Sequence, residues 1–173
     1  MSHNGKPLGR AASARTEGMA SADAAGELVP PKRIPVMCRA FAPVLAADGG
    51  GAIVNMLSIT SFYSNPLDAS YGASKATAWS MTNGVRLELH HQGTLVVAVH
   101  AGFIDTDMAA LTNAPKISPE SVARQVFDAV EAGQIEVLAD ERTRTVKASL
   151  SRDQELIYPP VQEFWDAAVT GAS

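Results

Sequence analysis

The fold of this chain is decided by the residues from Ala52 to Lys75, which read AIVNMLSITSFYSNPLDASYGASK. Residues 52–57 form a short, nearly continuous apolar run, which is typical of a buried parallel strand. A polar loop follows over residues 58–70, and a long amphipathic helix is predicted over residues 71–91. The pattern therefore predicts a strand that leads through a serine and a polar loop into a helix.

Outside this stretch the alternation of helices and strands continues. Upstream, residues 36–45 predict a short amphipathic helix that Pro43 kinks or ends. Downstream, the sequence predicts strands at residues 94–99 and 135–139, with a helix between them that begins at Ser118-Pro119. Helices and strands in this order indicate an α/β domain with a parallel sheet and flanking helices.

Two polar segments are expected to lie outside the core. Residues 1–33 are rich in Ala, Gly and Ser and hold no periodic apolar stretch, so we expect a flexible arm that buries too little surface to become ordered. The run Asp140-Glu141-Arg142 is expected to form a solvated charged turn. Residues 34–173 are then the folded domain.

Composition excludes several classes of protein. The 173 residues carry a formal charge of −4, which argues against a nucleic-acid partner because phosphate-binding surfaces are basic. Cys38 is the single cysteine, so a disulfide framework and a multi-cysteine zinc site are excluded, and the histidines lack metal-ligand spacing. No apolar run approaches the ~18–20 residues needed to span a bilayer. We therefore expect a soluble, cytoplasmic protein with no metal site and no membrane partner.

Three polar residues are placed where they could do chemistry. Ser58 follows the first strand, at the edge where open α/β sheets bind their ligands. Tyr71 and Lys75 lie four positions apart on one helix, so they share a face. An ammonium near a phenol lowers the pKa of the tyrosine, which could then exchange a proton with an alcohol or carbonyl that Ser58 also contacts. The alternative is a surface tyrosine beside a solvated lysine, because such pairs also arise by chance.

Three segments together carry a resemblance to a known family. They are residues 55–58 (NMLS), 71–76 (YGASKA) and 102–108 (GFIDTDM). Their order and spacing resemble the carboxyl-terminal half of a short-chain dehydrogenase/reductase, over about residues 36–158. The resemblance implies a Rossmann-type sheet and an NAD(P)-dependent oxidoreductase with a small carbonyl or alcohol as its substrate.

The resemblance also implies a role for each matching residue. Ser58 would orient and polarise the substrate carbonyl, and Tyr71 would be the general acid in reduction and the general base in oxidation. Lys75 would lower the pKa of the tyrosine and hold the nicotinamide ribose. The residues implied in cofactor binding, as NAD or NADP, are Tyr71, Lys75, Gly102, Ile104 and Thr106.

The amino-terminal half of that family is not found. Neither Thr-Gly-x-x-x-Gly-x-Gly nor Gly-x-Gly-x-x-Gly occurs in the sequence, and residues 29–33 hold no asparagine where the family has a catalytic one. The usual Pro-Gly after the second strand is Ala101-Gly102, preceded by His100. We therefore expect a Rossmann-type sheet that is incomplete at its amino-terminal side, with an unpaired strand edge, from a truncated or frame-shifted coding sequence.

Two other functions stay open at this point. A catalytically silent fragment could act as an interaction module, in which the apolar faces of residues 40–47 and 79–89 form a homo-oligomer or pair with an intact relative. Ordinary core packing would explain the same faces. A serine hydrolase would need Ser74 as nucleophile, but the segment GASKA at residues 72–76 misses the Gly-x-Ser-x-Gly elbow at its last position.

Overall fold

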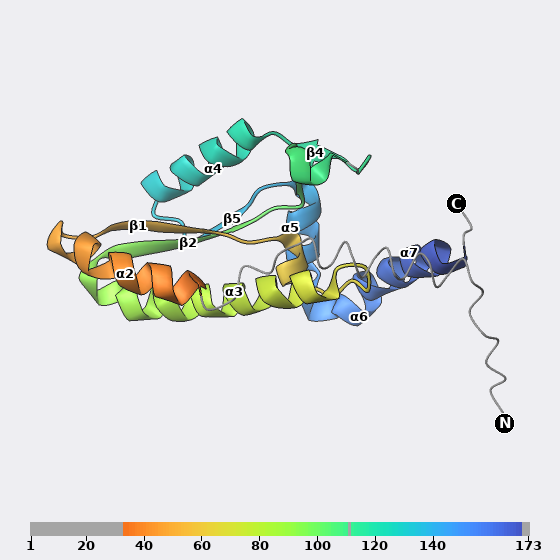
Figure 1. Ribbon diagram of the computed structural model, residues 1–173, viewed down its shortest axis with the longest axis horizontal. Coiled ribbons are helices and arrows are strands. Elements are labelled where there is room, and N and C mark those ends of the chain that lie inside the picture. The colour runs from red at the N-terminus through yellow and green to blue at the C-terminus, as the bar shows by residue number, and fades with distance from the viewer. Residues whose placement is uncertain (1–32, 111, 171–173) are drawn as a thin grey trace, which may run out of the picture.

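A three-layer arrangement forms the body of the protein. The computed structural model describes residues 33–110 and 112–170, so the expectation that the arm before Arg33 is flexible lies outside the described residues. Helices α2 and α3 cover one face of the central sheet and α4 covers the other (Figure 1). The predicted α/β class with a parallel sheet is confirmed.

Helices and strands alternate along the described chain. In order they are α2 (Arg33–Ala47), β1 (Gly51–Met56), α3 (Ala69–Leu89), β2 (Thr94–His100), β3 (Phe103–Ile104), β4 (Lys116–Ile117), α4 (Pro119–Glu131), β5 (Glu136–Leu138), α5 (Glu141–Ala148), α6 (Asp153–Leu156) and α7 (Tyr158–Thr170). Short 3-10 turns lie at Ile59–Ser61 (η1), His90–Gln92 (η2), Asp107–Ala109 (η3) and Leu150–Arg152 (η4). The two-residue strands β3 and β4, which pair with each other, were not predicted.

The main sheet has the strand order β1-β2-β5, and both pairs are parallel. Met56 of β1 lies opposite Val99 of β2, which in turn lies opposite Val137 of β5. Because β2 is central and covered on both faces, nearly all its side chains are buried, which explains its continuous apolar sequence. Strand β1 is the edge of the described sheet, and its Val54 is 37% exposed.

The starts of β1 and β2 meet at two glycines. Gly50 has a φ of +118°, a conformation that side chains other than glycine rarely adopt. A Cβ at this position would lie 2.5 Å from the carbonyl oxygen of Gly93, so only a glycine lets the two turns approach this closely.

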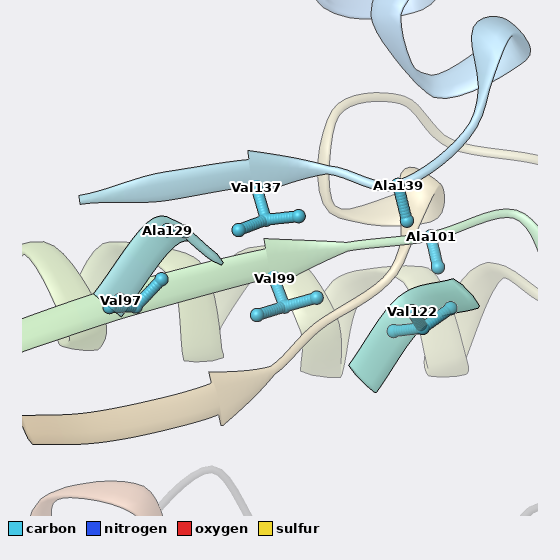
Figure 2. Packing of buried hydrophobic residues seen from close by; sticks show 7 residues of the cluster. All are labelled: Val97, Val99, Ala101, Val122, Ala129, Val137 and Ala139. Carbon is cyan, nitrogen blue, oxygen red and sulfur yellow. The ribbon is translucent and has the colours of Figure 1, made fainter. Parts of the chain in front are cut away.

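Strand β2 divides the interior into two cores. Val97 and Val99 point toward α4 and β5 and pack in a cluster with five further buried residues, Ala101, Val122, Ala129, Val137 and Ala139 (Figure 2). Val96 points to the opposite face and packs with Cys38 of α2 and Val85 of α3. The alternation of side chains along a strand thus lets one strand anchor both helical layers.

The prediction that Pro43 kinks or ends the first helix is wrong about the end. Helix α2 contains Pro43 and continues to Ala47. A proline removes the hydrogen bond to the carbonyl four residues earlier, here that of Arg39. Both residues are exposed, so water can satisfy this carbonyl and the helix tolerates the interruption.

None of the described helices combines the length and apolar character that crossing a membrane requires.

The difference between the edge strand β1 and the central strand β2 generates a stability prediction. Val54 and Val97 are register partners, but Val97 is fully buried while Val54 is 37% exposed. We expect Val97→Ala to lower the free energy of unfolding by about 2 kcal/mol, because it removes two methyl groups and leaves a cavity. Val54→Ala is the matched control and should cost less than about 1 kcal/mol. Urea denaturation measures both, and equal losses would contradict the assigned burial.

Candidate active site

Ser58 lies just beyond the carboxyl end of β1. It is buried and is the N-cap of η1, where its Oγ accepts hydrogen bonds from the backbone N–H of Thr60 at 3.2 Å and from the Thr60 hydroxyl at 3.0 Å. These two bonds hold the Ser58 hydroxyl oxygen from one side. Its own proton is left to donate to a further acceptor.

Tyr71 and Lys75 project from the first turns of α3 toward the same region. The Ser58 side chain lies close enough to the Tyr71 phenol to lower the pKa of that phenol by hydrogen bonding. The Lys75 Nζ lies 5.5 Å from the centre of the Tyr71 ring and donates to the carbonyl oxygen of Met56 at 3.2 Å. At Gly72, helix α3 lies close to η1: an added Cβ would lie 3.4 Å from the carbonyl oxygen of Thr60. The structure therefore brings the trio (Ser58, Tyr71 and Lys75) together.

The electrostatics of Tyr71 differ from the sequence-based expectation. Burial raises the pKa of the phenol above its ordinary value, the hydrogen bond from Ser58 lowers it, and the charge of Asp68 raises it. Burial lowers the pKa of Lys75. The expectation that Lys75 leaves Tyr71 with a depressed pKa is not met in this structure, because loss of hydration outweighs the favourable contacts.

A cavity of about 280 Å³ adjoins the trio. Ser58 and Tyr71 line it, and so do the three residues predicted from the loop after β2, which are Gly102, Ile104 and Thr106. Lys75 is absent from the lining and lies behind Tyr71, against the end of β1. Five of the six predicted site residues thus share one cavity, and the sixth contacts a residue that lines it.

Asp140 ties the loop after β2 to helix α5. Its Oδ2 accepts from the backbone N–H of Gly102 at 2.7 Å, and its carboxylate also accepts from the backbone N–H and hydroxyl of Thr143 at 2.9 and 2.8 Å. The expectation that Asp140 belongs to a solvated turn is wrong. Asp140 is instead the N-cap of α5. An aspartate just before a helix is a sequence signal for this role, but the sequence gives no sign of its hydrogen bond to Gly102.

Residues that the sequence did not single out line a second, adjoining cavity of about 610 Å³. Tyr63, Asp68, Phe103 and Arg142 are among those shared by the linings of both cavities. An Arg142 Nη atom lies 3.4 Å from the Tyr63 hydroxyl. Most of the other residues that line the larger cavity are apolar, and many of them belong to α5, α6 and α7. The groove beside the trio therefore combines a few polar groups with an apolar wall.

The hydrolase alternative finds no support in the geometry. Ser74 lies within α3, and its hydroxyl donates to the carbonyl oxygen of Tyr71 at 2.7 Å. A nucleophilic serine of the elbow type stands instead on a sharp turn between a strand and a helix. Within residues 33–110 and 112–170 no group of three His, Cys, Asp or Glu side chains is arranged to hold a metal ion.

Known proteins share this arrangement over part of their length. Residues 34–116 match the family described as short chain dehydrogenase. A 3-oxoacyl-[acyl-carrier-protein] reductase from Synechocystis sp. is 35% identical over 104 residues, which cover 60% of this chain and 42% of that protein.

Solved structures agree. The crystal structure of a short chain dehydrogenase from Burkholderia cenocepacia J2315 in complex with NADP has a TM-score of 0.67 and 37% identity, covering 72% of this chain and 52% of that one. A 7beta-hydroxysteroid dehydrogenase has a TM-score of 0.55 and 26% identity, covering 66% of this chain and 46% of that one. The chain thus spans about half the length of the proteins it matches.

The bond between Asp140 and Gly102 generates a prediction about the loop. We expect Asp140→Ala to lower the free energy of unfolding by about 1 kcal/mol through the lost cap, and to speed hydrogen exchange at the Gly102 amide because that amide loses its acceptor. Ser118→Ala is the control, since the Ser118 hydroxyl caps α4 by accepting from the backbone N–H of Ser121, within its own helix. Amide exchange followed by NMR separates the two, and unchanged exchange at Gly102 in Asp140→Ala would refute the tie.

Proposed function

Because this chain belongs to the short-chain dehydrogenase family through residues 34–116, we propose that it is an oxidoreductase that interconverts a carbonyl and an alcohol with a nicotinamide dinucleotide. The observation that carries the proposal is that Ser58 and Tyr71 line the wall of one cavity, together with the loop from Gly102 to Thr106. Two hydroxyl groups that converge in this way can bind a single substrate oxygen.

The residues present fit the nicotinamide end of such a cofactor. The loop from Gly102 to Thr106 lines the cavity beside Tyr71, as contact with a nicotinamide ring requires. The Lys75 ammonium has three donors, of which the Met56 carbonyl takes one, so others are left for the ribose hydroxyls. The 173 residues hold no glycine-rich phosphate turn, so we assign no residues to the pyrophosphate.

The trio accounts for the proton that the reaction moves. When bound, the nicotinamide supplies the hydride in reduction and accepts it in oxidation. In reduction the Ser58 hydroxyl donates a hydrogen bond to the carbonyl oxygen, and Tyr71 transfers its phenolic proton to that oxygen as it becomes an alcohol. The phenolate that is left is stabilised by the Lys75 ammonium. In oxidation the phenolate takes the proton back from the alcohol.

The raised pKa of Tyr71 suits the reductive direction. A phenol is protonated at neutral pH and burial raises its pKa further, so Tyr71 carries the proton that reduction requires. The hydrogen bond with Ser58 lowers the pKa and so eases the loss of that proton. We propose NADP(H) as the first cofactor to test, since the relative that is 37% identical was solved with NADP, and NAD(H) as the second.

Loss of the phenol tests this function. With the folded full-length chain we expect saturable binding of NADPH or NADH by isothermal titration, and reduction of carbonyl compounds that Tyr71→Phe slows by about 100-fold or more while cofactor binding persists. Lys75→Ala should weaken binding as well as turnover.

Tyr158→Phe is the matched control, because Tyr158 begins α7 and lines neither cavity. It should leave both binding and turnover unchanged. Absence of binding for all four nicotinamide dinucleotides at millimolar concentration, on a chain shown to be folded, would reject the oxidoreductase proposal.

We also propose self-association, on a separate observation. Helix α2 carries an outward apolar face, the α2 apolar face, formed by Met37, Phe41 and Val44, which are 54%, 53% and 57% exposed. These residues recur at i, i+4 and i+7, so they lie on one side of the helix, opposite the side that buries Cys38. An exposed stripe of this kind on a packed helix fits a helix–helix interface with a second copy.

The interface predicts a dimer whose stability depends little on salt, because its contacts are apolar. Phe41→Glu should shift the chain toward monomer, since it places a charge within the interface. Phe127→Glu is the control, because Phe127 is also exposed, at 69%, but lies on α4 across the sheet. Sedimentation equilibrium at low and high salt measures the shift, and an equal response in the two variants would count against this face.

A further inference from the structure

His100 is a buried polar residue that the proposed reaction does not use. It is the last residue of β2, and its side chain is fully buried. Its ring stacks on Phe62 with centres 4.2 Å apart and meets the edge of Trp79 at 5.7 Å. An imidazole in such surroundings loses its hydration, so its polar atoms need partners within the protein.

One ring nitrogen has such a partner, in the residue that carries the trio's hydroxyl. The Nδ1 of His100 lies 3.2 Å from the carbonyl oxygen of Ser58. A carbonyl oxygen can only accept a hydrogen bond, so Nδ1 carries the proton and donates it. The neutral ring is thereby held in one tautomer, in which Nε2 has a lone pair and no proton.

Burial keeps the ring neutral, although a carboxylate lies nearby. Nε2 has no hydrogen-bond partner among the described residues and lies 3.7 Å from the carboxylate of Glu136 on β5. That carboxylate is already paired with Lys147 of α5 at 2.7 Å. Burial lowers the pKa of His100 to about 4, the bond to Ser58 and the charge of Glu136 raise it, and Lys147 and Arg86 lower it. At neutral pH the contact with Glu136 is therefore not an ion pair.

The hydrogen bond from His100 complements the strand ladder at Ser58. The backbone amides on either side of Ser58 both donate to the neighbouring segment. Leu57 donates to Val99 of β2 at 2.7 Å, and Ile59 donates at 2.8 Å to Ala101, which directly follows β2. The carbonyl oxygen of Ser58 accepts a hydrogen bond from the backbone N–H of Ser61 at 3.0 Å, within the same turn. Its bond to β2 comes from a side chain, the imidazole of His100. A side chain of the neighbouring strand thus sets the peptide from which the Ser58 hydroxyl projects.

We propose that His100 is a positioning residue, whose neutral imidazole holds the Ser58 carbonyl through Nδ1–H and so keeps the Ser58 hydroxyl directed at Tyr71. The role in turnover rests on the proposed oxidoreductase function, but the hydrogen bond itself does not. The alternative is that His100 only fills space in the aromatic cluster, in which case its hydrogen bond has no effect on the trio.

The tautomer is the direct test and needs neither cofactor nor turnover. In the full-length chain with ¹⁵N-labelled imidazole, NMR at neutral pH should show the proton of His100 on Nδ1 and a bare Nε2. A proton on Nε2, or a doubly protonated ring, would overturn the proposal, since neither form is the neutral donor that it requires. This measurement uses the wild-type chain, so it can overturn the proposal even if a variant fails to fold.

Two substitutions separate positioning from packing. His100→Phe keeps a ring for Phe62 to stack on but removes the donor, whereas His100→Asn loses the ring and keeps an N–H donor near the place of Nδ1. If His100 acts through Ser58, the phenol of Tyr71 should titrate at higher pH in His100→Phe than in the wild type, because Ser58 lowers its pKa. In His100→Asn it should titrate close to the wild type. NMR of tyrosine labelled at the phenolic carbon reads this without any activity.

Turnover gives the dependent readout. We expect His100→Phe to reduce kcat by about 10- to 100-fold with little change in the KM for the cofactor, and His100→Asn to recover most of the loss. An unchanged Tyr71 titration and an unchanged kcat in His100→Phe would overturn the proposal in favour of packing. A third outcome separates the two proposals. If the wild type has the Nδ1 tautomer and His100→Phe shifts the Tyr71 titration, but the wild type has no oxidoreductase activity, then the positioning role stands and the proposed function fails.

Discussion

The parallel pairing of β1 with β2 is the constraint on which the site depends. The ladder runs past the ends of both strands, so the residue before Ser58 is bonded to β2 and the residue after it to Ala101, which directly follows β2. The position of Ser58 therefore follows from the strand register and not from the preferences of the loop. A slip of one residue would turn Ser58 to the other side of the sheet, away from Tyr71, because side chains alternate along a strand. The register is held in turn by β2, whose valines anchor a core on each face.

Loss of hydration favours the neutral form of the groups around the cavity. Loss of hydration raises the pKa of Tyr71 and lowers the pKa of His100, so both are neutral at neutral pH. In this form the phenol can donate a hydrogen bond toward a substrate, and the imidazole donates one to the Ser58 carbonyl. Beside His100, the partly buried charges of Lys147 and Glu136 are paired with each other, and Lys147 also lies over the rings of Phe62 and Trp79. The neutral hydroxyl donors of Ser58 and Tyr71 suit the protonation of an oxygen that gains negative charge as a carbonyl is reduced.

The two proposed functions use different surfaces, so they do not exclude each other. The cavity lies at the carboxyl ends of β1 and β2, while the α2 apolar face is exposed on the side of α2 opposite its buried residues. Helix α2 can pack on the core and still offer an interface because its two sides differ. Cys38 and Ala42 are buried against α3 and the sheet, and Phe41 is exposed. Substitutions on the outward side should therefore change association without changing the trio.

The sequence by itself determined the order of elements, the parallel sheet and the trio, because these depend on local periodicity and on short spacings that the chain carries unchanged into the fold. The tertiary structure alone decided which groups meet across long separations: Gly102 bonds a carboxylate 38 positions away, and His100 bonds the Ser58 carbonyl 42 positions away. It also decided the direction in which the pKa of Tyr71 shifts: burial raises it, whereas the sequence predicted that Lys75 would lower it. Neither outcome is visible in a linear pattern, since hydrogen-bond partners and hydration are set by packing, and packing depends on residues that only the folded chain brings together.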